Sequence, residues 1–498
     1  MRPTQQAESQ VERVGREDLV LFINAAFSCT RQHEFYTDAG GQALTIEFLH
    51  QYILGNYRRL YARTLAAGVN HFNQALILFN LLATGQETPP SFRAEEGALI
   101  RAGLRALPPQ RALRLLERLR ERRVNNRRTR AVIRDFLAGR PDPVFDAIKY
   151  RPRVRSAARH AHLPLPGELG RFLFGNRKAP FETALLERFR QAAYSHEAVY
   201  GLPYTVAEGL ARKHGIPRDV FLSRIAEQMT AGERLRLQGV AAETRGVSLD
   251  IDLGRVSLTR LALYLLSLPV EAREARREEL QAALVSAARR TVRRAPFRLG
   301  KVAAVLDRSY STSGSAEKRR RPLAVALAAN SLLRIASREY RAFWTTPVED
   351  ELLLTARGQT DLATPLLDAL EWGAEVIVIV SDGYENDPPG AADQLVRVFR
   401  QKLDPEHHVS IVHANPVFDP GFFAPRPLGP SIPTVGLRDA EDLPTMLGFA
   451  RFADGTAPLS MLEEYLAVRV RELLETSRQV AKPQSGEGMP ASPALATE

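Results

Sequence analysis

The chain has 498 residues, which is enough for about two to four domains that each bury a core of their own. Its composition, 45% hydrophobic and 25% charged, is that of a globular protein. Lys and Arg number 68 against 57 for Asp and Glu, and the resulting net charge of +11 favours an anionic partner such as nucleic acid, unless arginine is simply used throughout the chain. The single cysteine, Cys29, excludes an internal disulfide and a cysteine-built zinc site.

The start of the sequence, over 1–16, is polar and lacks the apolar core of a signal peptide. No apolar run reaches the length of a membrane span. A lone cysteine fits a reducing compartment. We therefore expect a flexible segment over 1–16 and a cytoplasmic protein that has no membrane partner.

Between residues 17 and 296 the sequence predicts helices almost throughout, because apolar residues recur at spacings of three and four. Proline and glycine separate these segments at intervals of about 15–25 residues, which is typical of antiparallel helix pairs joined by short loops. We expect an all-α, HEAT-like helical-repeat domain, although the sequence shows no strict internal repeat. The clearest predicted helices are 73–84, 95–106, 109–122, 127–137, 181–193 and 258–268.

After residue 297, β-rich apolar runs alternate with helical stretches, which predicts a Rossmann-like α/β domain over 297–456 with helices on both faces of a parallel sheet. A further helix is predicted over 457–478 and a disordered tail over 479–498. The predicted strands are 301–307, 340–346, 352–355, 375–381, 409–413 and 432–436, and the predicted helices of this domain are 322–337, 363–370, 391–402 and 442–452.

Three oxygen-bearing side chains, Asp307, Ser309 and Ser311, follow the first predicted strand at alternate positions. Open α/β sheets bind ligands at the carboxyl ends of their strands, and Thr360 and Asp382 lie in a loop and at a strand end that can meet there. Such a set of hard oxygen ligands suits Mg²⁺ or Mn²⁺. The alternative is that the two serines only cap the following helix.

These five positions, with the glycine after Asp382, resemble the metal-ion-dependent adhesion site of von Willebrand factor A domains. The resemblance implies that Ser309 and Ser311 bind the metal directly, that Thr360 binds it directly or through water, and that the carboxylates bind mostly through water. One position then stays open for an acidic group of a partner. It implies binding rather than catalysis, and the motif offers no His or Glu as a general base, so a metal-dependent hydrolase is the weaker alternative. We expect the nearby His407, His408 and His413 to be solvated or hydrogen-bonded residues without a catalytic role.

The densest run of positive charge spans 111–159 and contains few acids. Arginines three and four apart share a helix face, and the stretch 149–155 alternates charges around one tyrosine that could stack on a base. Arginine at this density binds phosphate with a marked salt dependence, whereas the alternative is a solvated face whose arginine stems cover apolar surface. The candidate RNA-binding residues are Arg120, Arg123, Arg127, Arg128, Arg130, Arg134, Lys149, Tyr150, Arg151, Arg153, Arg155 and Arg159.

A helical array followed by an adhesion-type domain resembles the Ro autoantigen family, whose TROVE module also occurs in telomerase-associated and vault proteins. The resemblance rests on domain order, length and charge, since the helical half offers no diagnostic motif. It implies a ring of helices that binds small non-coding RNA and the single-stranded ends of misfolded RNA, without enzyme activity. The alternative is a metal-dependent interaction scaffold that works with a MoxR-like AAA ATPase and binds no RNA.

Overall fold

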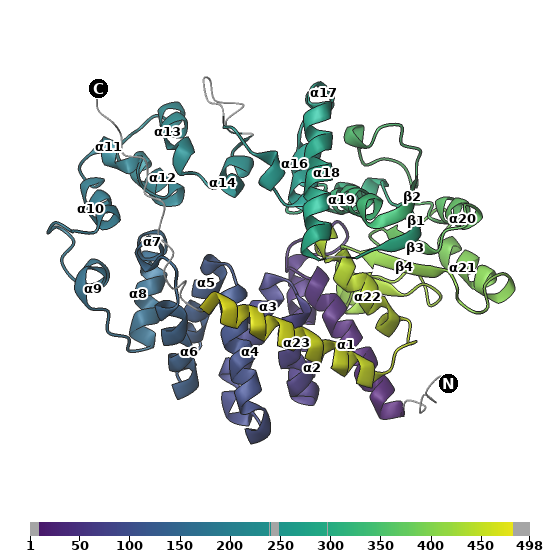
Figure 1. Ribbon diagram of the computed structural model, residues 1–498, viewed down its shortest axis with the longest axis horizontal. Coiled ribbons are helices and arrows are strands. Elements are labelled where there is room, and N and C mark those ends of the chain that lie inside the picture. The colour runs from purple at the N-terminus through teal and green to yellow at the C-terminus, as the bar shows by residue number, and fades with distance from the viewer. Residues whose placement is uncertain (1–8, 239, 241–248, 296, 482–498) are drawn as a thin grey trace.

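The computed structural model describes residues 9–238, 240, 249–295 and 297–481. A helical part comes first in the chain and an α/β part built on one sheet follows it. In Figure 1 the helices follow a curved path that leaves the α/β part, turns through α8 and α13, and returns to the α/β part at α16 and α18. The ribbon as a whole therefore has the outline of a ring.

The first helix shows how the helices of this chain begin. Ser9 and Glu12 form a capping box, in which the Ser9 hydroxyl accepts from the Glu12 N–H at 3.3 Å and the Glu12 carboxylate accepts from the Ser9 N–H at 2.9 Å. Residues 10–16, predicted to be flexible, are therefore helical, while 1–8 lie outside the described residues. The first nine helices are α1 (Gln10–Ser28), α2 (Ala39–Arg63), α3 (His71–Ala83), α4 (Arg93–Ala106), α5 (Pro109–Glu121), α6 (Arg127–Ala138), α7 (Pro143–Lys149), α8 (Arg151–His160) and α9 (Gly167–Phe174).

The helices pack against others that are close in the chain, as in α3 on α4 and α5, α5 on α8, and α6 on α8. A small second core, centred on Tyr204 and Phe221, joins the middle of the array. The predicted helical part is confirmed in outline, but a HEAT-like regularity stays a prediction. The remaining helices of this part are α10 (Ala184–Gln191), α11 (His196–Val199), α12 (Tyr204–Lys213), α13 (Arg218–Ile225), α14 (Ala231–Arg236), α16 (Leu258–Ser267), α17 (Val270–Ala275) and α18 (Arg277–Arg294).

The α/β part is built on a parallel five-stranded sheet with the order β2-β1-β3-β4-β5. Successive residues of a strand face opposite sides, so Ala304 and Leu306 pack on one face and Ala303 and Val305 on the other. Both faces are apolar, as expected for strands covered on both sides. The strands are β1 (Leu299–Leu306), β2 (Ser337–Trp344), β3 (Val376–Val380), β4 (Ser410–Asn415) and β5 (Thr434–Gly436).

Four helices cover this sheet. The buried helix α19 (Arg321–Ala336) packs on β1 and β2 and also carries α16 and α18, so it joins the two parts of the protein. On the opposite face, α20 (Ala363–Glu371) packs beside α21 (Ala391–Lys402). The helix α22 (Leu443–Ala453) lies on the same face as α19 and contacts β4 and β5. The predicted parallel α/β arrangement is therefore confirmed.

Both ends of the helical part are hydrogen-bonded to the α/β part. At one end Asn24 of α1 accepts from the Gly436 N–H at 2.9 Å and donates to the Thr434 carbonyl at 3.2 Å. At the other end the Thr259 hydroxyl of α16 donates to the Glu441 carboxylate at 2.6 Å and accepts from the Ala440 N–H at 2.9 Å. These buried polar contacts fix where the curved path of helices begins and ends.

One predicted strand, 352–355, is wrong. Residues Glu351–Leu353 form the 3-10 helix η7, and the carbonyls that a neighbouring strand would have used accept from arginine side chains. Arg273 donates to the carbonyls of Leu352 and Leu354 at 3.1 and 2.8 Å. The leucines of this segment are buried as anchors of a loop, which gives the same apolar signal as a short strand.

The last described helix, α23 (Leu459–Ala481), leaves the α/β part and lies across α1, α2 and α4 (Figure 1). Its residues Leu462 and Leu466 are fully buried there. The helix is longer than the predicted 457–478, because 479–481 continue it. The rest of the predicted disordered tail, 482–498, lies outside the described residues.

Candidate metal centre and basic surface

Asp307 and Asp382 lie next to each other because they follow the neighbouring strands β1 and β3. In the β1–β3 pair Leu306 is in register with Val380, and the Asp307 N–H continues the ladder by donating to the Val380 carbonyl at 3.0 Å. Both carboxylates therefore lie at the same edge of the sheet, the one formed by the carboxyl ends of its strands. Both side chains are buried, at 1% and 2% exposure.

The two serines turn back over the same strand end. The Asp307 carboxylate accepts from the Ser309 N–H at 2.8 Å, which tightens the loop after β1. The hydroxyl oxygens of Ser309 and Ser311 are 3.2 Å apart and both side chains are buried. Because Ser311 also hydrogen-bonds to Asp382, the loop after β1 is joined to the end of β3. Neither serine caps α19, whose first turn begins ten residues after Ser311.

Thr360 lies in the loop before α20, which is held against the ends of both strands. Its N–H donates to the Asn386 side chain at 2.8 Å, and its carbonyl accepts from the Asn386 N–H at 3.2 Å. The neighbouring Gly358 carbonyl accepts from the Tyr310 N–H at 3.1 Å. Thr360 is buried beside the loops that carry the other four residues, so all five predicted ligands belong to one edge of the sheet.

Arg308, which had no role from the sequence, points away from the carboxylates and organises this loop. Its guanidinium donates to the Thr355 carbonyl at 3.1 Å and to the Pro347 carbonyl at 3.1 Å. It is buried and therefore cannot steer a partner. The arginine instead fixes the chain that leads to Thr360.

Two carboxylates so close together and so deeply buried repel each other. Burial and then the charge of Asp382 raise the pKa of Asp307 to about 7, against the hydrogen bonds from Ser309. Burial also raises the pKa of Asp382, although Ser311 and the Tyr384 N–H oppose it. A cation or a proton is therefore needed at this edge of the sheet near neutral pH.

The donor set fits a divalent cation. Asp307 Oδ2 is buried and has no hydrogen-bond partner. A buried polar atom without a partner is unfavourable, so a partner at this position would be stabilising. Among the described residues no three His, Cys, Asp or Glu side chains group as metal ligands, which excludes a site of the zinc type there. Two carboxylates with three hydroxyls are the oxygen set that Mg²⁺ and Mn²⁺ accept, with Asp307 and Asp382 balancing the charge.

Gly383 allows the chain after Asp382 to turn tightly. Its φ is +81°, and a Cβ at this position would lie 2.5 Å from the Arg426 carbonyl oxygen and 2.9 Å from the Asn415 side-chain nitrogen. Only glycine meets both conditions without strain. The Asp-Gly pair of the motif thus positions the second carboxylate.

Two aromatic residues from the helical part, Phe35 and Tyr36, lie over this edge, and sequence reasoning missed both. Tyr36 stacks on Tyr384 with ring centroids 3.9 Å apart, and the edge of Phe35 meets Tyr310 at 6.1 Å. Nothing in the local sequence of 29–38 signals this contact, because its partners lie more than 270 residues further along the chain.

The histidines considered above do not form a second reactive group. His413 is buried and its two ring nitrogens lie 2.9 Å from the Ser381 hydroxyl and 3.1 Å from the Thr434 hydroxyl. Burial lowers its pKa to about 4, so the ring is neutral at physiological pH. His408 is exposed beside Asp404. These positions match the solvated or hydrogen-bonded residues that were expected.

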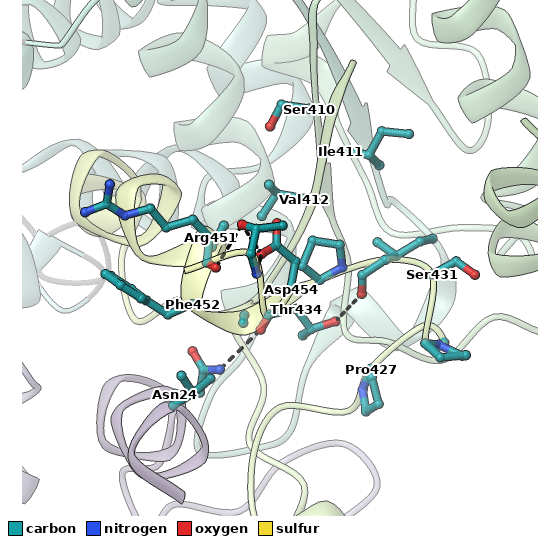
Figure 2. A pocket seen from close by; sticks show the side chains of 18 of the residues that line it. Asn24, Ser410, Ile411, Val412, Pro427, Ser431, Thr434, Arg451, Phe452 and Asp454 are labelled. Atoms are coloured by element: carbon teal, nitrogen blue, oxygen red, sulfur yellow. Dashed lines mark hydrogen bonds between the residues drawn. The ribbon is translucent and has the colours of Figure 1, made fainter. Parts of the chain in front are cut away.

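A groove of about 870 Å³ lies elsewhere, at the β4–β5 edge of the sheet. Figure 2 shows its wall of Ser410, Ile411 and Val412 from β4, facing Asn24 of α1 and Thr434 of β5. None of the five predicted metal ligands lines this groove. Its size therefore gives no support to the metal centre.

The candidate RNA-binding residues separate into two groups, and the first group is engaged in holding helices together. Arg128 donates to Glu96 at 2.6 Å, and Arg153 to Glu117 at 3.1 Å. Arg134 and Lys149 also belong to this group, since Arg134 donates to the Ala161 carbonyl and Lys149 pairs with Glu233. The Tyr150 hydroxyl donates to Gln110, and the Arg151 guanidinium lies over the buried Phe172.

In the second group, Arg120, Arg123 and Arg127 are exposed and Arg130 is half-buried. Across the described residues, Arg120, Arg123, Arg127 and Arg130 form no ion pair with a carboxylate. Burial lowers the pKa of His160, and the charges of Arg120 and Arg130 lower it further, which shows how closely these arginines gather.

Arg155 and Arg159 share one exposed aromatic ring that sequence reasoning missed. Their guanidinium carbons lie 5.9 and 5.5 Å from the centroid of Phe174, which is 40% exposed. Two arginines around one exposed ring form a surface on which a base can stack between charges that meet its phosphates. The ring was missed because Phe174 ends the next helix, outside the basic run.

Comparisons with known proteins add little to these observations. No protein-family model matches the chain, and no curated protein matches it significantly. The chain is similar to the crystal structure of the Deinococcus radiodurans RO (RSR) protein, with 15% identity and a TM-score of 0.43 over 88% of this chain and 100% of that chain. A similarity of this size does not by itself establish a shared function. In the described part of the chain no helix is long and apolar enough to cross a membrane.

Proposed function

We propose that this chain is a non-enzymatic RNA-binding protein of Ro type, in which a von Willebrand A-like domain holds a divalent cation, Mg²⁺ or Mn²⁺. The RNA would be small and non-coding or misfolded, with an accessible single strand. The helical part would bind it, and the ring outline of the ribbon agrees with the family resemblance of the sequence.

One observation carries the RNA assignment: the Arg155–Phe174–Arg159 cluster lies close in sequence to four arginines that have no acidic partner among the described residues. A solvated helix face would pair its arginines with nearby acids, as Arg153 does with Glu117. Cations left unpaired around an exposed ring suit a flexible anionic chain with aromatic bases.

The experiment is to sequence RNA that co-purifies with the protein and to measure its retention. Arg120→Glu with Arg130→Glu should abolish retention at physiological salt, because a repulsive charge replaces each cation that would meet a phosphate. The control, Arg255→Glu with Arg338→Glu, changes the net charge equally at exposed positions elsewhere. Equal RNA retention by both double variants would contradict the proposal.

A metal-dependent interaction scaffold, partnered by a MoxR-like AAA ATPase, is the second candidate. It is favoured by the unpartnered Asp307 Oδ2, which suits a cation that links the domain to an acidic protein group. This function requires a pull-down of the ATPase that both a chelator and Asp307→Ala remove. A pull-down that survives both treatments excludes the metal link.

A further inference from the structure

A strap formed by residues 29–38, between α1 and α2, runs from the helical part across the metal centre. The Asn70 side chain holds its start by donating to the Cys29 carbonyl at 2.7 Å. At its end the Asp38 carboxylate accepts from the Gly41 N–H at 2.7 Å and caps α2. Both ends of the strap therefore belong to the helical part.

The middle of the strap is bound to the α/β part, just after the metal motif. The Ser315 hydroxyl donates to the His33 carbonyl at 2.6 Å, and the Glu317 carboxylate accepts from the His33 N–H at 3.0 Å. The next residue, Glu34, forms a buried ion pair with Lys318. These contacts fix the strap within a few residues of Ser311.

The two residues that follow Glu34 contact the two loops that carry the candidate ligands. Phe35 packs edge-on against Tyr310, which lies between the two serines, and Tyr36 stacks on Tyr384, two residues after Asp382. The Tyr36 hydroxyl hydrogen-bonds to the Ser311 side chain and lies within range of the charges of Asp382 and Asp307. The phenol oxygen is therefore close to the candidate ligands.

The outward face of Tyr36 remains accessible, since the residue is 47% exposed. A tyrosine that served only to fill space would be buried among apolar neighbours, with its hydroxyl toward water. Here the hydroxyl lies beside a polar centre, the ring packs on Tyr384, and about half of the residue stays accessible to solvent. This orientation fits a group that occupies a binding position.

We propose that Tyr36 belongs to the metal centre as its in-chain occupant. Its hydroxyl oxygen takes the position on the cation that Asp307, Ser309, Ser311, Thr360 and Asp382 leave open. An acidic group of a partner then reaches the cation only after the strap has moved aside. This inference rests on the metal centre proposed above and names what fills that centre in the unbound protein.

The test uses Mn²⁺ alone as the probe, with the full-length protein. Bound Mn²⁺ speeds the relaxation of water protons in proportion to the exchanging waters that it carries. Tyr36→Phe keeps the ring stack on Tyr384 and removes only the hydroxyl, so water gains the position and the relaxation enhancement per bound Mn²⁺ increases. Tyr36→Ala should increase it at least as much. Tyr194→Phe, at a 73% exposed tyrosine far from the site in the helical part, is the matched control and should change nothing.

Equal enhancement for the unmodified protein and Tyr36→Phe, with Mn²⁺ bound to both, would overturn the role of Tyr36 and leave the metal centre standing. If the unmodified protein binds no more Mn²⁺ than Asp307→Asn, the metal centre itself is wrong and both proposals fall. RNA retention is measured separately and decides the RNA assignment in either case. Since Tyr36→Phe preserves the packing, a folding defect in Tyr36→Ala does not affect these outcomes.

Discussion

The carboxylate of Glu34 and the ammonium of Lys318 form an ion pair that is buried between the helical part and the metal loop. Burial raises the pKa of Glu34 and lowers that of Lys318, and each charge opposes the shift of the other. The pair therefore ties the strap to the α/β part only while both charges are present.

Replacement of one partner should be costly. Lys318→Met leaves the Glu34 carboxylate buried without a cation, and we expect a loss of about 3–5 kcal/mol in the free energy of unfolding at pH 8. Urea denaturation measures this loss. The double variant with Glu34→Leu should recover most of it, and Arg255→Ala, in an exposed pair with Asp252, should cost under about 1 kcal/mol. A loss in Lys318→Met as small as that of the Arg255 control would contradict a closed, dry contact.

The metal-free protein should lose stability as the pH rises from about 4 to about 7. Folding raises the pKa of Asp307 from 3.8 to about 7, so the folded state binds more protons than the unfolded state in this window. The stability that protonation of Asp307 contributes is fully present below its pKa in the unfolded state. It is lost as the pH rises through its pKa in the folded state. Because a bound divalent cation favours the ionised carboxylate, Mg²⁺ should restore the stability at pH 7.5.

Asp307→Asn tests this account by thermal unfolding. The variant should be more stable than the unmodified protein in chelator at pH 7.5, and Mg²⁺ should no longer raise its melting temperature. Destabilisation in chelator together with an intact response to Mg²⁺ would show that Asp307 is not a ligand.

A separate acid effect of the opposite sign should come from His50. Its Nε2 lies 3.1 Å from the Asn73 side-chain oxygen and its Nδ1 lies 2.7 Å from the Tyr61 hydroxyl, and burial lowers its pKa to about 4. Since the unfolded pKa is near 6.5, stability from this group is complete above that value and is lost as the pH falls towards 4. Unfolding at several pH values, with Mg²⁺ present, should show a shallower loss for His50→Gln than for the unmodified protein. His408→Gln, at an exposed site, should leave the slope unchanged.

The salt dependence of RNA binding should separate the arginines that contact phosphate from those that hold helices. Arg155→Gln with Arg159→Gln should reduce the slope of log affinity against log salt by about 1.4, or about 0.7 for each arginine that no longer neutralises a phosphate. Phe174→Ala should cost about 1–3 kcal/mol of affinity and leave the slope unchanged, because stacking releases no counterion. Arg153→Gln, whose arginine is paired with Glu117, is the control. An equal slope for the control and the double variant would exclude this surface.

The sequence was sufficient to place the candidate metal ligands at strand ends wherever local pattern decides the structure. Val302 to Leu306 and Val376 to Val380 are uniformly apolar because both faces of their strands are covered, and this marks where Asp307 and Asp382 emerge. A strand was wrongly predicted over 352–355 because leucines that anchor a loop give the same apolar pattern as leucines of a strand.

Contacts between residues far apart in the chain could not be predicted from the sequence. Arg128 and Arg155 look alike in the basic run, yet one is held by Glu96 of an earlier helix and the other lies on Phe174 of a later one. Tyr36 reaches its site only because α1, which precedes the strap, packs against β5 of the α/β part. Long-range contacts of this kind have no local signature that periodicity could detect.

The position of α23 also has a consequence for how the protein is made. Leu462 and Leu466 complete the apolar surface of the first helices, and Asn24 of α1 bonds to Gly436, 412 residues further along the chain. These helices therefore keep unsatisfied apolar surface until α23 has been synthesised. During that interval they depend on chaperones or on fast completion of synthesis, and truncations within α23 should appear as aggregation in cells.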